Sequence, residues 1–94
     1  MPPDSTAAAR LEQLRHEIAT TDEQLVRLIA HRLELAREIG QTKQALGLPV
    51  MDPAREAEVV RRAVEQARAR GADAELVRGV LWRIIDAARA VQDR

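Results

Sequence analysis

The chain has 94 residues and a formal net charge of zero, because 15 Lys and Arg side chains balance 15 Asp and Glu. This length predicts a single domain, and the charge balance argues against a nucleic-acid or membrane-surface binder, which would carry a net basic surface. Cysteine is absent, which excludes disulfides and thiolate metal sites. Aromatic residues make up 1% of the chain, so any core must consist of Leu, Ile, Val and Ala.

Residues 1–6 contain two prolines and small polar residues, and we predict that they form a disordered tail before a helical domain over residues 7–94. The first ten residues lack the apolar stretch of a signal peptide, and no segment approaches the roughly 20 apolar residues that span a bilayer. We therefore expect a cytoplasmic protein.

The segment from Ala7 to about Leu46 predicts one long helix. Its apolar residues are spaced alternately by three and four positions once three polar residues, Thr21, Arg32 and Thr42, are included. We call this stripe the seam; its apolar members are Leu11, Leu14, Ile18, Leu25, Leu28, Leu35, Ile39 and Leu46. Nothing in the segment breaks a helix except Gly40, which costs about 1 kcal/mol relative to Ala.

Two further helices are predicted. Gly47 and Pro49 end the first, and Asp52-Pro53 begins the second with an N-cap followed by proline at the first helical position. Gly71 ends the second helix near Arg70, and Asp73 caps a third that runs to the C-terminus. The expected fold class is therefore all-α.

The first helix would be about 60 Å long at 1.5 Å per residue, whereas a compact monomer of this size is nearer 30 Å across. Two shorter helices cannot cover such a seam from end to end. We therefore expect two copies of the chain to pair as an intertwined homodimer.

Arg32 lies on the seam, where an unpaired arginine is costly. On the pattern alone it snorkels to solvent or pairs with a carboxylate such as Glu56, or else it awaits an anionic ligand. Lys43 projects from nearly the same face, about 16 Å further along the helix. Arg15 lies about 25 Å from Arg32 and points elsewhere, so it could share a ligand with Arg32 only if it came from a partner chain.

Polar residues also interrupt the two later helices. Asp52, Arg55 and Glu56 gather on the first turn of the second helix, where capping and exposed charge explain them adequately. Gln92 continues the apolar stripe of the third helix four residues after Ala88, and on its own it indicates fraying of the chain end.

Taken together, these positions resemble the AroQ-type chorismate mutase family over about residues 11–92. The resemblance rests on the order and spacing of several short stretches: Leu14-Arg15-His16-Glu17-Ile18, Arg32-Leu33-Glu34-Leu35-Ala36, Ile39-Gly40-Gln41-Thr42-Lys43 and Pro49-Val50-Met51-Asp52-Pro53-Ala54-Arg55-Glu56. It implies three helices per chain intertwined in a homodimer, and rearrangement of chorismate to prephenate in aromatic amino-acid biosynthesis.

The resemblance also implies roles for individual residues. Arg32 and the Arg15 of a partner chain would bind the two substrate carboxylates, while Lys43 and Gln92 would donate to the ether oxygen of the breaking bond. Glu56 would hold the ring hydroxyl with help from Asp52, and Arg55 would line the pocket. Many members of the family carry serine where this chain has Ala88, which removes one polar contact to the substrate.

A unimolecular pericyclic shift needs no nucleophile, metal or cofactor, and we expect none here. Three alternatives stay open: an isochorismate-pyruvate lyase of the same fold, a non-catalytic helical dimerisation or regulatory module, and a plain coiled coil. Small members of the family sometimes depend on a partner enzyme of the same pathway, which leaves such a partner open as well.

Overall fold

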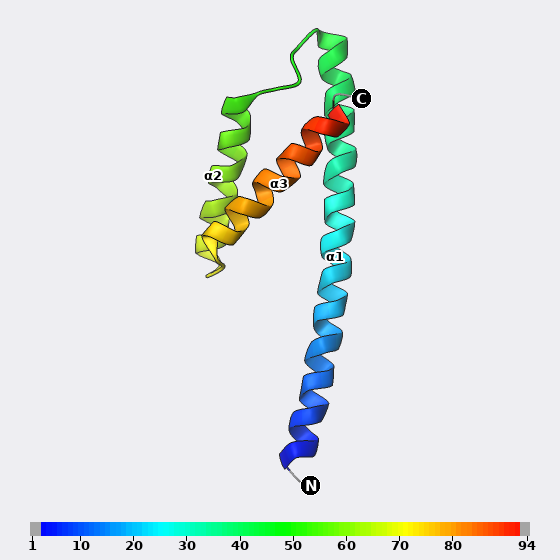
Figure 1. Ribbon diagram of the computed structural model, residues 1–94, viewed down its shortest axis with the longest axis vertical. Helices are drawn as coiled ribbons and strands as arrows, with labels where there is room; N and C mark the ends of the chain where they lie inside the picture. The colour runs from blue at the N-terminus through cyan, green and yellow to red at the C-terminus, as the bar shows by residue number, and fades with distance from the viewer. Residues whose placement is uncertain (1–2, 93–94) are drawn as a thin grey trace. The chain divides into compact units, whose positions relative to one another are not determined.

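The computed structural model describes residues 3–92, which form three helices: α1 (Pro3–Leu46), α2 (Pro53–Ala69) and α3 (Ala74–Gln92) (Figure 1). No strand occurs among these residues, so the predicted all-α, three-helix chain is confirmed. None of the helices in the described part of the chain is long and apolar enough to cross a membrane.

α1 begins at Pro3, earlier than the predicted start at Ala7. Proline lacks a backbone N–H and has a helical φ, so it fits the first turn of a helix, and three alanines follow closely. Residues 3–6 are therefore helical rather than part of the predicted tail, while Met1 and Pro2 lie outside the described residues.

The two breaks between helices follow the predicted capping residues. Gly47 (φ 69°) and Gly71 (φ 70°) adopt the left-handed conformation that glycine tolerates best, and they end α1 and α2. The Asp52 side chain accepts a hydrogen bond from the Arg55 backbone N–H (3.2 Å), and Asp73 accepts one from that of Leu76 (3.1 Å). Each aspartate thereby satisfies an N–H that the first helical turn leaves without a partner.

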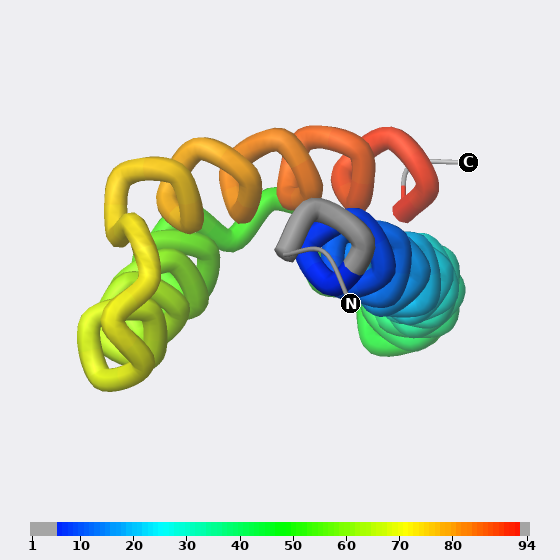
Figure 2. Tube along the Cα trace, turned by 90° about the horizontal axis from the view of Figure 1, so that it is seen from below, coloured from blue at the N-terminus to red at the C-terminus, as the bar shows by residue number. Residues whose placement is uncertain are grey.

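α2 and α3 form a helical hairpin around a small aliphatic core. Val60 and Val64 of α2 and Ile85 of α3 are buried, and Val59, Ala74 and Leu81 pack against them. The two helices lie closest near the Gly71 turn and diverge away from it, as both views show (Figures 1 and 2). Residues from this far end of the hairpin, where α2 begins and α3 ends, line the cavity described below.

The chain divides into two units between His31 and Arg32, and α1 contributes to both. In the first unit, every side chain from Thr6 to His31 is exposed, including the seam residues Leu11, Leu14, Ile18, Leu25 and Leu28. In the second unit, Ala36 and Gly40 of α1 are buried.

Seam residues Thr21 and Thr42 each donate their hydroxyl to the carbonyl four residues earlier (2.9 Å), which satisfies a polar group on an apolar stripe.

Candidate functional site

The second unit contains a cavity of about 480 Å³ lined by all three helices and the loop before α2. It is lined by Arg32, Leu35, Ala36, Ile39, Lys43, Val50, Asp52, Arg55, Glu56, Val59, Ile85, Ala88, Arg89 and Gln92. Four of these side chains are cationic and two are carboxylates, which leaves an excess of two positive charges. A chain with no net charge thus concentrates positive charge in one apolar-walled cavity, an arrangement suited to a small dianion.

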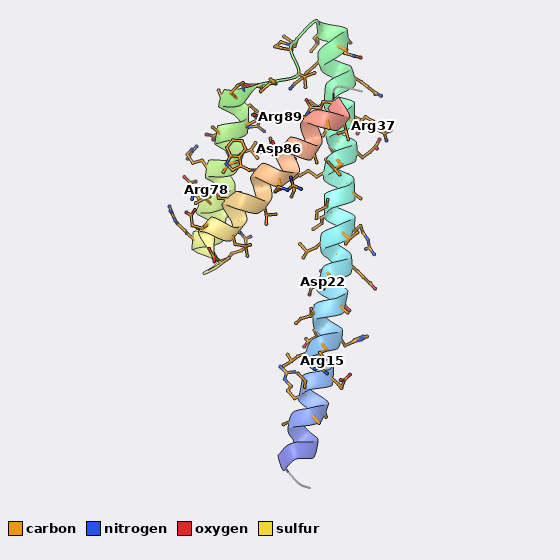
Figure 3. The ribbon with its side chains drawn as sticks, in the orientation of Figure 1. Arg15, Asp22, Arg37, Arg78, Asp86 and Arg89 are labelled. Carbon is orange, nitrogen blue, oxygen red and sulfur yellow. The ribbon has the colours of Figure 1, made fainter. Side chains whose placement is uncertain are left out.

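Seven of the predicted site residues line this cavity: Arg32, Lys43, Asp52, Arg55, Glu56, Ala88 and Gln92. The eighth, Arg15, is not among the lining residues. It lies in the first unit, where its exposed side chain pairs with Glu12 one turn earlier (3.2 Å). Exposed pairs of this kind contribute little stability, so the Arg15 guanidinium is available to another anion. Figure 3 labels Arg15 on α1.

Two arginines of the cavity have unengaged guanidinium groups. Arg32 is half-buried, and within residues 3–92 its side chain has neither an ion-pair nor a hydrogen-bond partner. The same is true of the Arg55 side chain, which leaves only its backbone N–H bonded, to Asp52. The pairing of Arg32 with Glu56 that the sequence left open does not occur, because another residue holds Glu56. An unpaired guanidinium fork matches a carboxylate through two parallel hydrogen bonds.

Lys43 and Gln92 meet at one end of the cavity, although 49 positions separate them in sequence. The Lys43 Nζ donates to the Val50 carbonyl (2.9 Å) and to the Gln92 Oε1 (3.4 Å). Gln92 is half-buried, so the structure contradicts the frayed chain end that its position alone indicated. Because the amide oxygen accepts from Lys43, the amide NH₂ is left to donate elsewhere.

Gly40 explains how α3 approaches α1 so closely here. A Cβ placed on Gly40 would lie 2.7 Å from both the Cα and the carbonyl oxygen of Gln92, closer than real Cβ contacts allow. The glycine that weakens α1 locally is therefore what allows the Gln92 backbone to pack against this helix. Its position next to Gln92 could not be read from the sequence.

Glu56 is held by an arginine that the sequence analysis did not single out. Arg89 Nε donates to Glu56 Oε2 (2.8 Å), and Arg89 Nη2 donates to Glu56 Oε1. The hydrogen bond from Arg89 lowers the pKa of Glu56, partial burial opposes this shift, and the positive charges of Arg89 and Lys43 lower the pKa further. Glu56 is therefore an ionised, fixed acceptor at the cavity wall.

The spacing of the third helix already indicated that Arg89 faces the same side as other residues of the site. Arg89 lies four residues after Ile85 and three before Gln92, spacings that place it on the same face of a helix as both. Ala88 beside it is 5% exposed and presents only a methyl group to the cavity. No group of His, Asp and Glu within the described residues is arranged to hold a metal ion.

Comparison with known proteins identifies the family. Residues 14–93 match the family described as Chorismate mutase type II. The chain belongs to this family. The resemblance predicted from the sequence is thereby confirmed.

Relatives of this chorismate mutase family member include the T-protein of Enterobacter agglomerans, 39% identical over 82% of this chain and 21% of the T-protein. A chorismate mutase of Methanocaldococcus jannaschii is 28% identical over 88% of this chain and 84% of its own length. A solved structure of a conserved hypothetical protein from Pyrococcus furiosus superposes with a TM-score of 0.72 at 37% identity, covering 88% of this chain and 95% of that one. The chain thus spans about a fifth of the T-protein, but most of the other two.

Proposed function

We propose that this chain is a chorismate mutase, an isomerase that converts chorismate to prephenate by an intramolecular Claisen rearrangement. The observation that carries this proposal is the cavity itself. It combines an excess of two positive charges, two arginine forks that have no partner within residues 3–92 and a lysine–glutamine donor pair, in a chain of the chorismate mutase family. Chorismate is a compact dicarboxylate with a ring hydroxyl and an ether oxygen, so each of these features has a counterpart on the substrate.

The two carboxylates would be bound by arginines of different chains. Arg32 takes one of them, and Arg15 of a second copy takes the other, with Arg55 adding positive charge beside them. Because these forks fix orientation as well as charge, they hold the flexible substrate in the folded conformer that reacts. Because the rearrangement is already unimolecular, this gain comes from restricting internal rotations of the substrate and not from bringing two reactants together.

The ether oxygen would be the target of Lys43 and Gln92. Negative charge develops on this oxygen as its C–O bond lengthens, so donors placed there bind the transition state more tightly than the ground state. The Lys43 Nζ supplies a fixed positive charge, and its bond to the Gln92 Oε1 turns the amide so that the NH₂ group remains to donate. Glu56 would accept from the ring hydroxyl, with Asp52 nearby.

The second copy of the chain is a part of this proposal. The seam residues in the first unit are exposed, among them Ile18 at 62%, and a helix with such a stripe is stabilised by burying it against another helix. We propose an intertwined homodimer, which covers the seam and brings in Arg15. We further expect the protein to act in the cytoplasm.

The test is direct measurement of chorismate loss and prephenate formation by the purified protein. Lys43→Ala is expected to reduce kcat by about 10²–10³-fold, the usual effect of removing one such donor. Gln44→Ala is the matched control, because Gln44 is exposed and does not line the cavity. Absence of chorismate turnover would overturn the proposal.

A parallel assay with isochorismate separates the mutase from a lyase of the same fold. Pyruvate release from isochorismate without prephenate formation from chorismate would assign the lyase instead. Turnover that is lost in Lys43→Ala while the dimer persists would exclude a non-catalytic module.

A further inference from the structure

Within residues 3–92, Arg89 is the cavity arginine whose three guanidinium nitrogens each have an acceptor in the same chain. Its Nε and Nη2 donate to the two oxygens of Glu56, and its Nη1 lies 3.4 Å from Asp86 Oδ1. Arg32 and Arg55, by contrast, have no side-chain partner among the described residues. The Arg89 guanidinium is therefore less available to a substrate carboxylate than those of Arg32 and Arg55, and its two bonds to Glu56 point to that carboxylate as the group on which it acts.

The Arg89–Glu56 pair joins the first turn of α2 to the last turns of α3 across the wide end of the hairpin. The Glu56 side chain is 13% exposed and the Arg89 side chain 34%, so water competes weakly for the carboxylate. A fork that grips both oxygens leaves the carboxylate a single orientation, whereas a lone carboxylate rotates about its last bond. Each oxygen still has a lone pair for another donor.

We propose that Arg89 is a positioning residue, which holds the Glu56 carboxylate ionised and oriented so that it accepts a hydrogen bond from a hydroxyl of the ligand in the cavity. This proposal rests on the function proposed above, since the hydroxyl is that of chorismate. It assigns Arg89 no contact with the substrate. In this proposal, Arg89 of α3 sets the orientation in which Glu56 of α2 accepts a hydrogen bond from the substrate.

The charge environment of Glu56 makes this testable by pH. The groups that line the same cavity are Arg32 and Lys43 of α1, Asp52 and Arg55 at the start of α2, and Arg89 of α3. The hydrogen bond from Arg89 is the largest influence lowering the pKa of Glu56, and burial acts in the opposite direction. Without Arg89, burial raises the pKa of Glu56, and Lys43 offsets this only in part.

The experiment compares wild type with Arg89→Met in two measurements. The first follows the Glu56 carboxyl ¹³C shift against pH, with Glu56→Gln used to assign the resonance. The second follows kcat/KM for chorismate between pH 4.5 and 8. We expect the pKa of Glu56 to rise in Arg89→Met, and kcat/KM to fall severalfold more at pH 5 than at pH 8, because a protonated Glu56 no longer accepts.

Two further variants separate positioning from a merely structural role. Arg78→Met removes another α3 arginine that pairs with a glutamate, Glu75, outside the cavity, and it should leave the pH profile unchanged. Arg89→Lys keeps the charge without the fork, and it should restore part of the activity at pH 5. In a double-mutant cycle, Arg89→Met should change kcat/KM much less in the Glu56→Gln background than in wild type.

An unchanged pKa of Glu56 in Arg89→Met, or additive effects of Arg89→Met and Glu56→Gln on kcat/KM, would overturn the proposal. Failure of the proposed function has a different signature. In that case wild type does not turn over chorismate at all, whereas the pKa measurement still reports whether Arg89 controls Glu56.

Discussion

The two units of the chain contrast sharply in what they bury. From Thr6 to His31 every side chain is exposed, although the seam there carries five large apolar residues. From Arg32 onward, residues of all three helices line a charged cavity, and α2 and α3 form a small aliphatic core. The second unit thus has its cavity-lining charged groups in place within one chain. The first unit instead exposes an apolar stripe and Arg15, which are available to a partner. In the proposed homodimer, the first unit of one chain contributes Arg15 to the cavity of the other.

The largest effects are expected when one arginine is removed from either unit. Arg15→Ala and Arg32→Ala are each expected to reduce kcat/KM at least about 10³-fold, since each leaves one substrate carboxylate without its fork. Far-UV circular dichroism should show helicity near wild type for both.

Mixing the two inactive variants should then recover activity. Random exchange at equal amounts makes about half of the dimers hybrid, and each hybrid has one site with both arginines, so about a quarter of wild-type activity is expected. The control is each variant exchanged with itself, which should stay inactive. No recovery after subunit exchange has been verified by mass would contradict a site shared between chains.

A second test asks whether the seam of the first unit is an interface. Leu25, which is 53% exposed in the single chain, lies on the seam, and Gln24 lies beside it, about 100° around the helix. Leu25→Glu should dissociate the dimer at micromolar concentration, because it loses about 2–3 kcal/mol of apolar burial per chain and buries a charge.

Gln24→Glu introduces the same residue one position away and should leave the dimer intact. Light scattering after size exclusion measures the mass of both variants. Equal masses for Leu25→Glu and wild type would mean that the seam is not the interface.

A third, smaller effect is expected within the second unit, at the contact between α1 and α3. Gly40→Ala should lower kcat about tenfold or more while KM changes less, because the added methyl group displaces the Gln92 backbone and with it a donor to the transition state. Gly79→Ala is the matched control: nothing lies within 4 Å of a Cβ at Gly79, so this variant should gain up to about 1 kcal/mol of stability and keep its activity.

Steady-state kinetics and thermal unfolding of the two alanine variants measure these effects. If Gly40→Ala and Gly79→Ala behaved alike, the close approach at Gln92 would have no bearing on catalysis.

The smallest expected effect is that of pH on wild type between pH 5 and 8. Glu56 has a lowered pKa, so it stays ionised as the pH falls to 5, and the Gln92 amide does not titrate at any accessible pH. We therefore expect kcat to be flat across this window. A steep ionisation within it, measured at constant ionic strength, would contradict Gln92 as the neutral donor.

Much of the fold was predictable because it depends on local rules. Gly47, Asp52, Gly71 and Asp73 mark helix ends through backbone conformation and capping, which act within a few residues, and each does so in the structure. α1 begins before the predicted Ala7, because Pro3, which the sequence analysis assigns to a tail, fits the first turn of a helix.

The relative positions of site residues were predictable where both residues lie on the same helix. Eleven residues of α-helix fix the relation of Arg32 to Lys43, and the structure brings both to one cavity. What each residue pairs with was not predictable in the same way. Glu56 was a candidate partner for Arg32, but the crossing of α2 and α3 brings Arg89 to it from 33 positions away.

The three helices, most of their ends and the charged residues that interrupt the apolar stripes follow from the sequence, because helix periodicity and capping operate over a single turn. Only the packing of the helices determines that Arg32 has no partner among the described residues, that Arg89 holds Glu56, and that Gly40 lets the Gln92 backbone approach α1. Those outcomes depend on how closely two helices pack and at what angle they cross, which no interval along the chain encodes.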